Sequence, residues 1–290
     1  MVPAALERVA PRLACANCGG SLAVVGSALR CERGHSFDVA HHGYVALGPP
    51  RGRPAPGDTS EMVAAREAFL AAGHYAPLEQ AIVDEVRVLV GPAEYRAFVA
   101  DVGAGTGRQL AALLDALDGA YGVALDASRP ALRRAARAHP RVAAVACDVW
   151  RRIPIQDDAA GLALNVFAPR NGAELARILA PGGALIVVTP TERHLAELVR
   201  LGGMIAVDPA KRARLDASLS PALEPAGSRD LEFEMTLSQV DAEALVAMGP
   251  SAHHVSREDV RSRLGGVREP ISVTASVAIE VRVPVPELSG

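Results

Sequence analysis

The stretch VADVGAGTGRQL, residues 99–110, decides the fold that this chain is expected to adopt. An apolar run at 97–102 is typical of a buried strand, and residues 107–117 have the apolar spacing of a helix. Between them stand Gly103, Gly105 and Gly107, in the spacing G-x-G-x-G. Glycines let the backbone approach a ligand closely, and the N-terminus of the following helix favours negative charge. The stretch therefore predicts a ligand-binding turn between a strand and a helix.

The alternation of strand and helix continues beyond this turn. Further strands are predicted at 120–125, 142–146, 161–167 and 184–189, and further helices at 130–138 and 172–179. Alternation at this spacing indicates an α/β fold, in which helices cover both faces of a parallel sheet. The segments 230–237 and 271–283 alternate apolar and polar residues instead, which predicts an antiparallel pair that closes the sheet.

Three acidic residues, Asp101, Asp126 and Asp148, stand at the ends of the first three predicted strands. Open α/β sheets bind ligands at this edge, where Asp126 can accept hydrogen bonds from ribose hydroxyls and Asp148 from an adenine amino group. The compact glycine spacing after Asp101 resembles that of class I S-adenosylmethionine-dependent methyltransferases, whose turn, here Gly103–Gly107, passes the methionine moiety. A purely structural turn, with Asp126 as a helix cap, is the alternative.

The first 35 residues contain a predicted metal site. Cys15 and Cys18 form a C-x2-C pair, and Cys31 and His35 form a C-x3-H pair. This spacing lets four sulfur and nitrogen donors surround one ion as a tetrahedron, which is the arrangement that zinc prefers. Because four protein ligands leave no open position, we expect the zinc to be structural.

The chain is expected to have three parts. Residues 1–47 form a zinc-binding domain, in which Phe37, Val39 and 44–47 would cover the apolar side of the metal. Residues 48–92 form a linker and helical segment, and residues 93–290 form a Rossmann-like methyltransferase domain.

Composition limits the partners and the location. The formal net charge is −3, which argues against a broad electrostatic binder of nucleic acid, although a local patch remains open. No signal peptide or membrane-spanning run is evident, and free cysteines with metal spacing fit a reducing cytoplasm. We expect Cys147, in an apolar run, to be a core residue.

Several long stretches resemble the large-subunit ribosomal RNA guanine-N1 methyltransferases. They cover nearly the whole chain in the same order as in that family. They are GDTSEMVAAREAFLAAGHYAPL (57–78), NVFAPRNGAELARILAPGG (165–183), VTPTERHLAELV (188–199) and ALVAMGPSAHHV (244–255), with the zinc quartet ahead of them.

This resemblance implies a fold and a function. Tyr75, Gly105, Thr106 and His194 match positions that contact S-adenosylmethionine, and the cysteine and histidine quartet matches the zinc ligands. The family methylates N1 of a guanine in hairpin 35 of 23S rRNA, at nucleotide 745 or 748. The second subgroup, which includes tylosin-resistance enzymes, is favoured here. The expected partner is the 23S rRNA hairpin, with no membrane partner, and a homodimer is left open.

The sequence also departs from the common family pattern. Thr106 replaces a usual glutamate, so Asp126 is expected to carry more of the cofactor binding. Asn165 and Arg170 flank the expected acceptor site, and Asn165 is hypothesised to orient the guanine edge. Candidate RNA contacts lie beside the zinc site and on an arginine-rich stretch, which alternatively is only an exposed helix face. They are Arg30, Arg33, Arg51, Arg53 and the arginines of residues 129–152.

Two rival functions are carried alongside the rRNA enzyme. One is a small-molecule methyltransferase of natural-product biosynthesis, which the acidic net charge favours. The other is a zinc-stapled binding module without catalysis. Added salt should weaken the binding of RNA steeply, whereas it should hardly change the binding of a small neutral acceptor. Salt dependence therefore separates the rRNA enzyme from the small-molecule enzyme.

Overall fold

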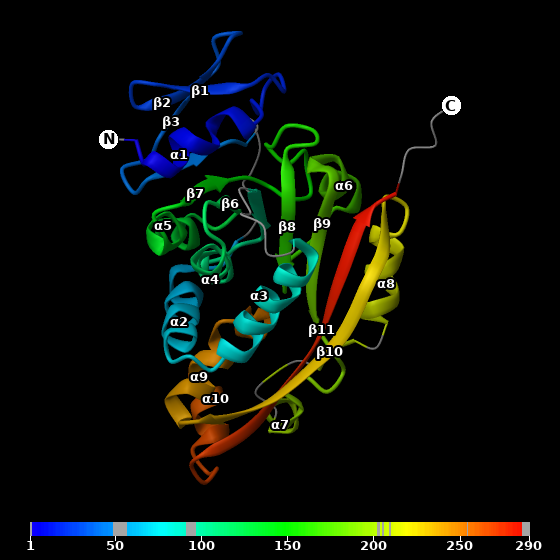
Figure 1. The fold of residues 1–290 in the computed structure, drawn as a ribbon. Helices are drawn as coiled ribbons and strands as arrows, with labels where there is room; N and C mark the ends of the chain where they lie inside the picture. The colour runs from blue at the N-terminus through cyan, green and yellow to red at the C-terminus, as the bar shows by residue number, and fades with distance from the viewer. Residues whose placement is uncertain are drawn as a thin grey trace.

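The computed structural model describes residues 2–48, 57–90, 97–201, 204, 206–208, 210–253 and 255–285. An eight-stranded sheet runs through its centre in the order β10-β11-β9-β8-β5-β6-β7-β4 (Figure 1). Its strands are β4 (Tyr44–Ala46), β5 (Phe98–Val102), β6 (Tyr121–Asp126), β7 (Val142–Ala146), β8 (Ala160–Val166), β9 (Leu179–Pro190), β10 (Leu223–Leu237) and β11 (Ile271–Pro284).

Strand direction in this sheet matches the expected α/β class. The six strands from β4 to β9 are parallel, and β5 lies in the middle between β6 and β8. The long strand β11 then pairs antiparallel with both β9 and β10, which confirms the predicted closing pair. Because the parallel strands all point the same way, their carboxyl ends meet at one edge, where open α/β sheets bind ligands.

Helices cover both faces of the sheet and cap one end of it. The helices are α1 (Ala4–Val9), α2 (Ser60–Ala71), α3 (Ala76–Val90), α4 (Arg108–Ala116), α5 (Arg129–Ala138), α6 (Gly172–Ile178), α7 (Ala196–Arg200), α8 (Lys211–Leu219), α9 (Gln239–Ala247) and α10 (Arg257–Leu264), with short 3-10 helices at Ala10–Arg12 and Pro250–His253. Some helix N-termini are capped by a side chain, as at the start of α2, where the Thr59 side chain accepts a hydrogen bond from Met62 N at 3.3 Å.

Each face of the sheet contributes to its own apolar core. On one face, side chains of α2 to α5 and of α9 pack against sheet residues such as Val99 and Leu164. On the other face, α1, α6 and the cysteine-rich unit pack against residues such as Ala100 and Val123. The cysteine-rich unit thus takes the place that a helical layer would otherwise occupy on that face.

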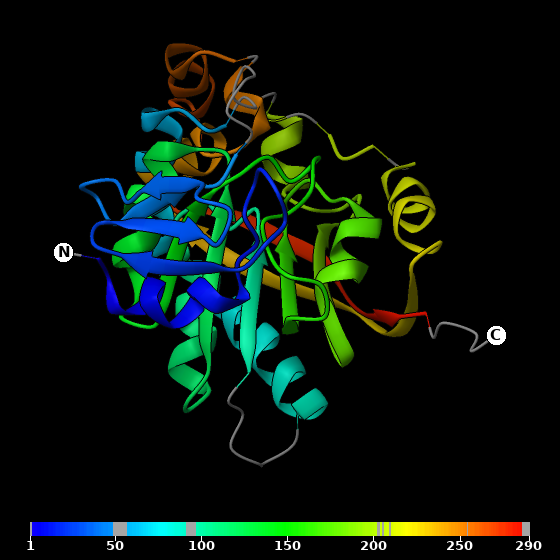
Figure 2. The same ribbon diagram turned by 90° about the horizontal axis from the view of Figure 1, so that it is seen from above.

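The cysteine-rich unit is a small antiparallel sheet of β1 (Leu22–Val25), β2 (Ala28–Cys31) and β3 (Ser36–Asp38). Figure 2 shows this sheet and α1 lying in front of the strands of the large sheet. Residues 44–47 do more than the expected cover of the metal. Val45 forms an antiparallel bridge with Val39 of the unit, and β4 also pairs in parallel with β7 of the large sheet, with Val45 opposite Val145.

The reason for this pairing with the large sheet is burial. Val45 is fully buried at the edge of the large sheet, where it joins the same core as Leu29 and Cys31 of the small sheet. A three-residue strand gains more apolar burial against a large sheet than against a small metal-bound unit. The domain boundary expected at residue 47 stays a prediction, and the residues on its two sides share one core.

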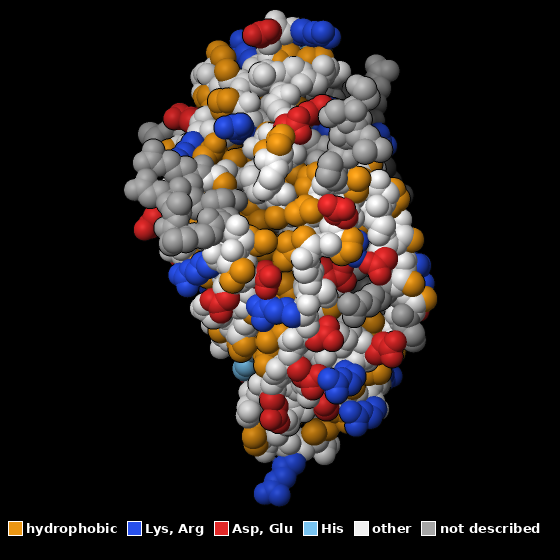
Figure 3. All heavy atoms as spheres, turned by 45° about the vertical axis from the view of Figure 1, so that its right-hand side comes forward, with side chains coloured by type: hydrophobic (Ala, Val, Ile, Leu, Met, Phe, Trp, Pro, Cys, Tyr) orange, Lys and Arg blue, Asp and Glu red, His pale blue; other side chains and the backbone are white. Residues whose placement is uncertain are grey.

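The hairpin of β10 and β11 extends past the rest of the sheet, and α9 and α10 lie in the connection between its two strands (Figure 1). In Figure 3, acidic and basic side chains are interspersed on the side of the molecule shown, with a hydrophobic band between them. The described residues drawn there form no continuous basic surface. In the part of the chain that the structure describes, no helix is both long enough and apolar enough to cross a bilayer.

Candidate functional site

The glycine turn after β5 lies at the carboxyl edge of the sheet, as predicted. Gly103, Gly105 and Gly107 have φ values of 83°, 55° and 77°, a region that side chains with a Cβ rarely adopt. Gly103 N and Ala104 N both donate to Leu125 O, at 2.8 and 3.0 Å, which ties the turn to the end of β6. The turn therefore needs its glycines for its backbone conformation.

Asp126 holds this turn together from the end of β6. Its Oδ2 accepts a hydrogen bond from Gly105 N at 2.8 Å, and its Oδ1 accepts one from Ser128 N at 2.7 Å. Burial raises the pKa of Asp126, against the lowering effect of these two backbone donors. Each carboxylate oxygen has a second lone pair, so hydroxyl groups of a ligand can still donate to it.

Asp101 is almost fully buried beneath the turn, and its Oδ2 has no hydrogen-bond partner. Burial raises the pKa of Asp101 to about 8, and the nearby charge of Asp126 adds to this shift. A buried carboxyl oxygen without a partner is costly, and such atoms are concentrated where a ligand completes the structure. A cationic or hydrogen-bond-donating ligand would satisfy this oxygen.

Asp148 lies just past β7, where its Oδ1 accepts a hydrogen bond from Trp150 N at 3.0 Å. Its other oxygen lies 3.5 Å from Arg151 Nε. The carboxylate is half-buried at the same edge of the sheet as Asp126. The three strand-end carboxylates predicted from the sequence are thus placed at one edge.

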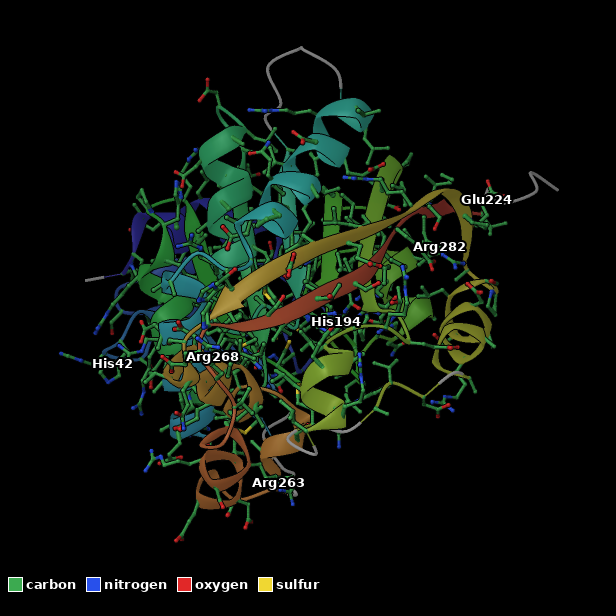
Figure 4. All side chains as sticks on the ribbon, turned by 90° about the horizontal axis from the view of Figure 1, so that it is seen from below. His42, His194, Glu224, Arg263, Arg268 and Arg282 are labelled. Atoms are coloured by element: carbon green, nitrogen blue, oxygen red, sulfur yellow. The ribbon has the colours of Figure 1, made fainter. Side chains whose placement is uncertain are left out.

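Tyr75 and His194, which are far apart in the sequence, come together through Phe167. The Phe167 ring centroid lies 6.2 Å from that of Tyr75 and 5.7 Å from that of His194. His194 Nδ1 lies 3.1 Å from Ser276 O, which fixes the imidazole against β11. Figure 4 labels His194 beside this strand and Arg282 farther along it. Burial raises the pKa of Tyr75.

Sequence reasoning missed Arg66, which lies in α2. Its guanidinium forms an ion pair with Asp58, and its Nη2 donates to Met248 O at 2.8 Å. A Cβ at Gly105 would lie 3.1 Å from Arg66 Nη1, so the cation borders the glycine turn directly. The only signal in the sequence was the position of Arg66 inside the family-like stretch 57–78.

Asn165 was hypothesised to orient the edge of a guanine, but its placement favours another role. The side chain is fully buried, and its Nδ2 donates to Val102 O at 3.0 Å and to Pro169 O at 2.9 Å. It therefore joins the end of β5 to the loop that follows β8. Asn165 Oδ1 and Arg170 Nη1 are buried without hydrogen-bond partners.

The four predicted metal ligands converge on one point. Their ligating atoms all lie within 4.8 Å of one another. Cys15 Sγ and Cys31 Sγ lie 3.5 and 3.3 Å from His35 Nδ1, and Cys18 Sγ lies 3.7 Å from Cys31 Sγ. Sulfur ligands at the corners of a tetrahedron around Zn²⁺ lie about 3.8 Å apart, given zinc–sulfur bonds of about 2.3 Å. The donor set therefore fits a closed, tetrahedral zinc site.

The arginine-rich stretch 129–152 divides into structural and exposed members. Arg141 donates to Leu117 O and Ala120 O at 2.8 Å each, so it serves the fold. Arg134 forms an ion pair with Glu67 across α5 and α2. Arg30 and Arg33 are exposed on the cysteine-rich unit, and Arg51 and Arg53 lie outside the described residues. Cys147 is buried, as expected of a core residue.

Two segments of the chain match known protein families. Residues 13–51 match the zinc-ribbon family described as "RlmA, N-terminal", and residues 99–183 match the family described as "Methyltransferase domain". A solved S-adenosylmethionine-dependent methyltransferase from Geobacter sulfurreducens, in complex with S-adenosyl-L-homocysteine, is 17% identical. The match covers 70% of this chain and 90% of that chain, with a TM-score of 0.44.

Two curated relatives match almost from end to end. The 23S rRNA (guanine(748)-N(1))-methyltransferase of Streptomyces fradiae is 44% identical over 97% of this chain and 99% of its own length. A protein of Micromonospora griseorubida, named as a 23S rRNA (guanine-N(1)-)-methyltransferase, is 49% identical over 93% of this chain and 96% of its own length. Together with the zinc-binding quartet and the glycine turn, these matches show that the chain belongs to the family of 23S rRNA guanine-N1 methyltransferases.

Proposed function

We propose that this protein transfers a methyl group from S-adenosylmethionine to N1 of a guanine in 23S rRNA, at nucleotide 748. The observation that carries the proposal is the 44% identity, over 97% of this chain, to the Streptomyces fradiae enzyme named for that nucleotide. The hairpin as substrate and a role in macrolide resistance follow from the same family resemblance. No observation of this kind favours a small-molecule acceptor.

The residues at the carboxyl edge fit S-adenosylmethionine. The buried oxygen of Asp101 lacks a partner, which suits the cofactor's ammonium group, and Arg66 supplies a positive charge for its carboxylate. Asp126 would hold the ribose and Asp148 the adenine amino group. The other residues in this proposed set border the methionine moiety, and they are Tyr75, Gly103, Gly105, Thr106, Gly107 and His194. When bound, the cofactor supplies an electrophilic methyl group on sulfur.

The protein contributes mainly position and orientation to such a transfer. Guanine N1 normally carries a proton and pairs inside a helix, so the base must be unstacked or already lie in a loop. N1 must also release its proton as the bond to the methyl carbon passes from sulfur to N1. Asn165 holds the loop after β8 in place at the cofactor turn, and His194 is fixed by β11. Arg66 borders the glycine turn, and its guanidinium pairs with Asp58 just before α2.

Cys15, Cys18, Cys31 and His35 are proposed to hold one structural zinc. Because Cys15 and Cys31 belong to the same apolar core as the sheet residues Val123 and Val145, the ion would stabilise one face of the catalytic sheet. The exposed Arg30 and Arg33 beside the ion are proposed phosphate contacts. The proposal includes the cytoplasmic location expected from the sequence, and it leaves the homodimer open, as the sequence does.

Incubation of the protein with S-adenosylmethionine and a 23S rRNA hairpin transcript tests the proposed function. N1 methylation blocks the pairing edge of guanine, so primer extension should stop next to nucleotide 748. A transcript with adenine at that position is the matched control and should give no stop. Methyl incorporation should also fall steeply with added salt. A full-length extension product with the guanine transcript would reject the proposed function.

A further inference from the structure

Phe167 stands out among the residues at the carboxyl edge of the sheet. Its φ is 54°, a left-handed conformation that is a genuine outlier for a bulky side chain. The ring is nevertheless 39% exposed, although most large apolar side chains of this protein are buried. A partly exposed aromatic residue with a strained backbone is difficult to explain by packing alone.

The surrounding structure imposes this conformation. Phe167 N donates to Val188 O at 3.0 Å, and Asn165 Nδ2 fixes the far side of the loop through Pro169 O. The next residue, Ala168, packs tightly on the glycine turn, since a Cβ at Gly103 would lie 2.3 Å from Ala168 Cβ. The loop therefore holds Phe167 next to Ala168, which packs on the cofactor turn, at the cost of an unfavourable backbone conformation.

A second strained residue lies next to the same ring. Leu195 has a φ of 55° and directly follows His194, whose imidazole contacts the Phe167 ring. Left-handed conformations of non-glycine residues are concentrated at functional sites, because the surroundings must impose them there. In the described part of the chain, the third such residue is Asp158, at the opposite end of β8.

We propose that Phe167 is the surface on which the target guanine stacks after it leaves the RNA helix. This inference rests on the proposed function and names the residue that receives the base. An extruded base exposes two π-faces, and proteins commonly cover one of them with an aromatic ring. Phe167 meets this need because it is partly exposed, its backbone is held in one conformation, and its ring contacts Tyr75 and His194, which match the methionine side of the site.

Trp150 is the other exposed aromatic side chain to consider, but its position suits this task less well. It follows β7, where its backbone N–H is bound to Asp148, on the side of the site proposed for adenine. Phe167 instead contacts Tyr75 and His194, which match the methionine side. Trp150→Ala therefore serves as a control for the loss of an exposed aromatic ring.

The substitution Phe167→Gly separates a stacking role from a structural one. Glycine relieves the strained φ, which offsets the loss of the ring contacts with Tyr75 and His194, so the melting temperature should stay close to the wild-type value. The kcat/KM for the rRNA hairpin should fall about 10- to 100-fold, which is the usual effect of losing one base–aromatic stack. The affinity for S-adenosylhomocysteine should stay within about twofold of the wild-type value. A merely structural residue would lose activity only together with stability.

Asp158→Gly is the matched control, because Asp158 has the same φ of 54° at the other end of the same strand. It should have the same effect on melting temperature and leave methyl transfer unchanged. Phe167→Tyr and Phe167→Trp should restore kcat/KM to within about threefold, whereas Phe167→Leu should not. With 2-aminopurine replacing the target guanine, the wild type should quench the probe's emission more strongly than Phe167→Leu does.

Three results would overturn the inference alone: full kcat/KM in Phe167→Gly, full kcat/KM in Phe167→Leu, or a parallel loss of affinity for S-adenosylhomocysteine. The last result would assign Phe167 to the cofactor instead of the base. A wild-type protein that transfers no methyl group to the hairpin would instead reject the proposed function, and the stacking role would fall with it. The two failures are therefore distinguishable.

Discussion

The cysteine-rich unit and the carboxyl edge of the sheet differ in whether their polar atoms converge on one point or are left without partners. In the unit, three thiols and one imidazole nitrogen lie within 4.8 Å of one another and face inward on one point. At the carboxyl edge, Asp101 Oδ2, Asn165 Oδ1 and Arg170 Nη1 are buried without partners. Two strained residues, Phe167 and Leu195, lie at the same edge.

This difference corresponds to two kinds of binding. A structural ion stays bound, so its ligands can be fully committed to it and the fold can depend on it. A site for ligands that come and go must tolerate unpaired groups and strain between binding events, and the rest of the molecule stabilises it meanwhile. The first kind should fail by unfolding, and the second should fail in binding while the fold survives.

Removal of the zinc ligands should give the largest effect. Cys18→Ser combined with Cys31→Ser should abolish zinc binding, which contributes on the order of 10 kcal/mol in small zinc-finger peptides. Because Cys31 belongs to the sheet core and β4 pairs with β7, amide exchange should also accelerate at Val45 and Val145. Hydrogen–deuterium exchange measures the amide exchange rates, and metal analysis measures the zinc content. Cys147→Ala, a buried cysteine outside the cluster, should keep its zinc, and unchanged protection in the double variant would contradict the comparison.

Neutralising Asp101 should have an intermediate effect that depends on pH. The folded-state pKa is about 8, whereas an unfolded aspartate titrates near 3.9. Between these values the folded chain holds a proton that the unfolded chain has released, so the stability of the ligand-free wild type falls as pH rises. The slope is at most about 1.4 kcal/mol per pH unit, and the decline ends above about pH 8.

Asp101→Asn lacks this titration, so its free energy of unfolding relative to wild type should increase steadily from pH 5 to pH 8. Urea denaturation without cofactor measures the difference. The control Asp230→Asn replaces an exposed carboxylate on β10 and should follow the wild-type curve. Parallel curves for Asp101→Asn and wild type would show that the buried carboxyl is already satisfied.

Replacement of Arg66 should give the smallest change, and it should be confined to binding. Arg66→Gln should weaken the affinity for S-adenosylhomocysteine about 10- to 100-fold, because one charge-assisted contact with the carboxylate is lost. The affinity for 5′-methylthioadenosine, which lacks the amino-acid portion, should not change. Isothermal titration calorimetry measures both ligands. Arg134→Gln, which removes the exposed ion pair with Glu67, should leave both affinities unchanged, and equal losses for the two ligands in Arg66→Gln would reject this role.

Much of the fold and part of the site could be predicted from local patterns. The glycine turn, Asp126 at the end of β6 and the zinc quartet were found because each depends on spacing over a few residues. Arg66 and Phe167 were not found, because an arginine in a helix and an aromatic residue after a strand are common in any sequence. Their roles depend on contacts with Gly105 and with His194, which lie far away in the chain.

By itself, the sequence determined the succession of strands and helices, the metal-ligand set and the cofactor turn, because periodicity and short spacing act along the chain. Only the tertiary structure decided that β4 joins the large sheet as well as the cysteine-rich unit, with Val45 fully buried between them. The tertiary structure also decided which buried polar atoms lack partners and that Phe167 combines a strained backbone with an exposed ring. These properties arise from packing between distant segments, since burial and backbone strain are set by neighbours in space.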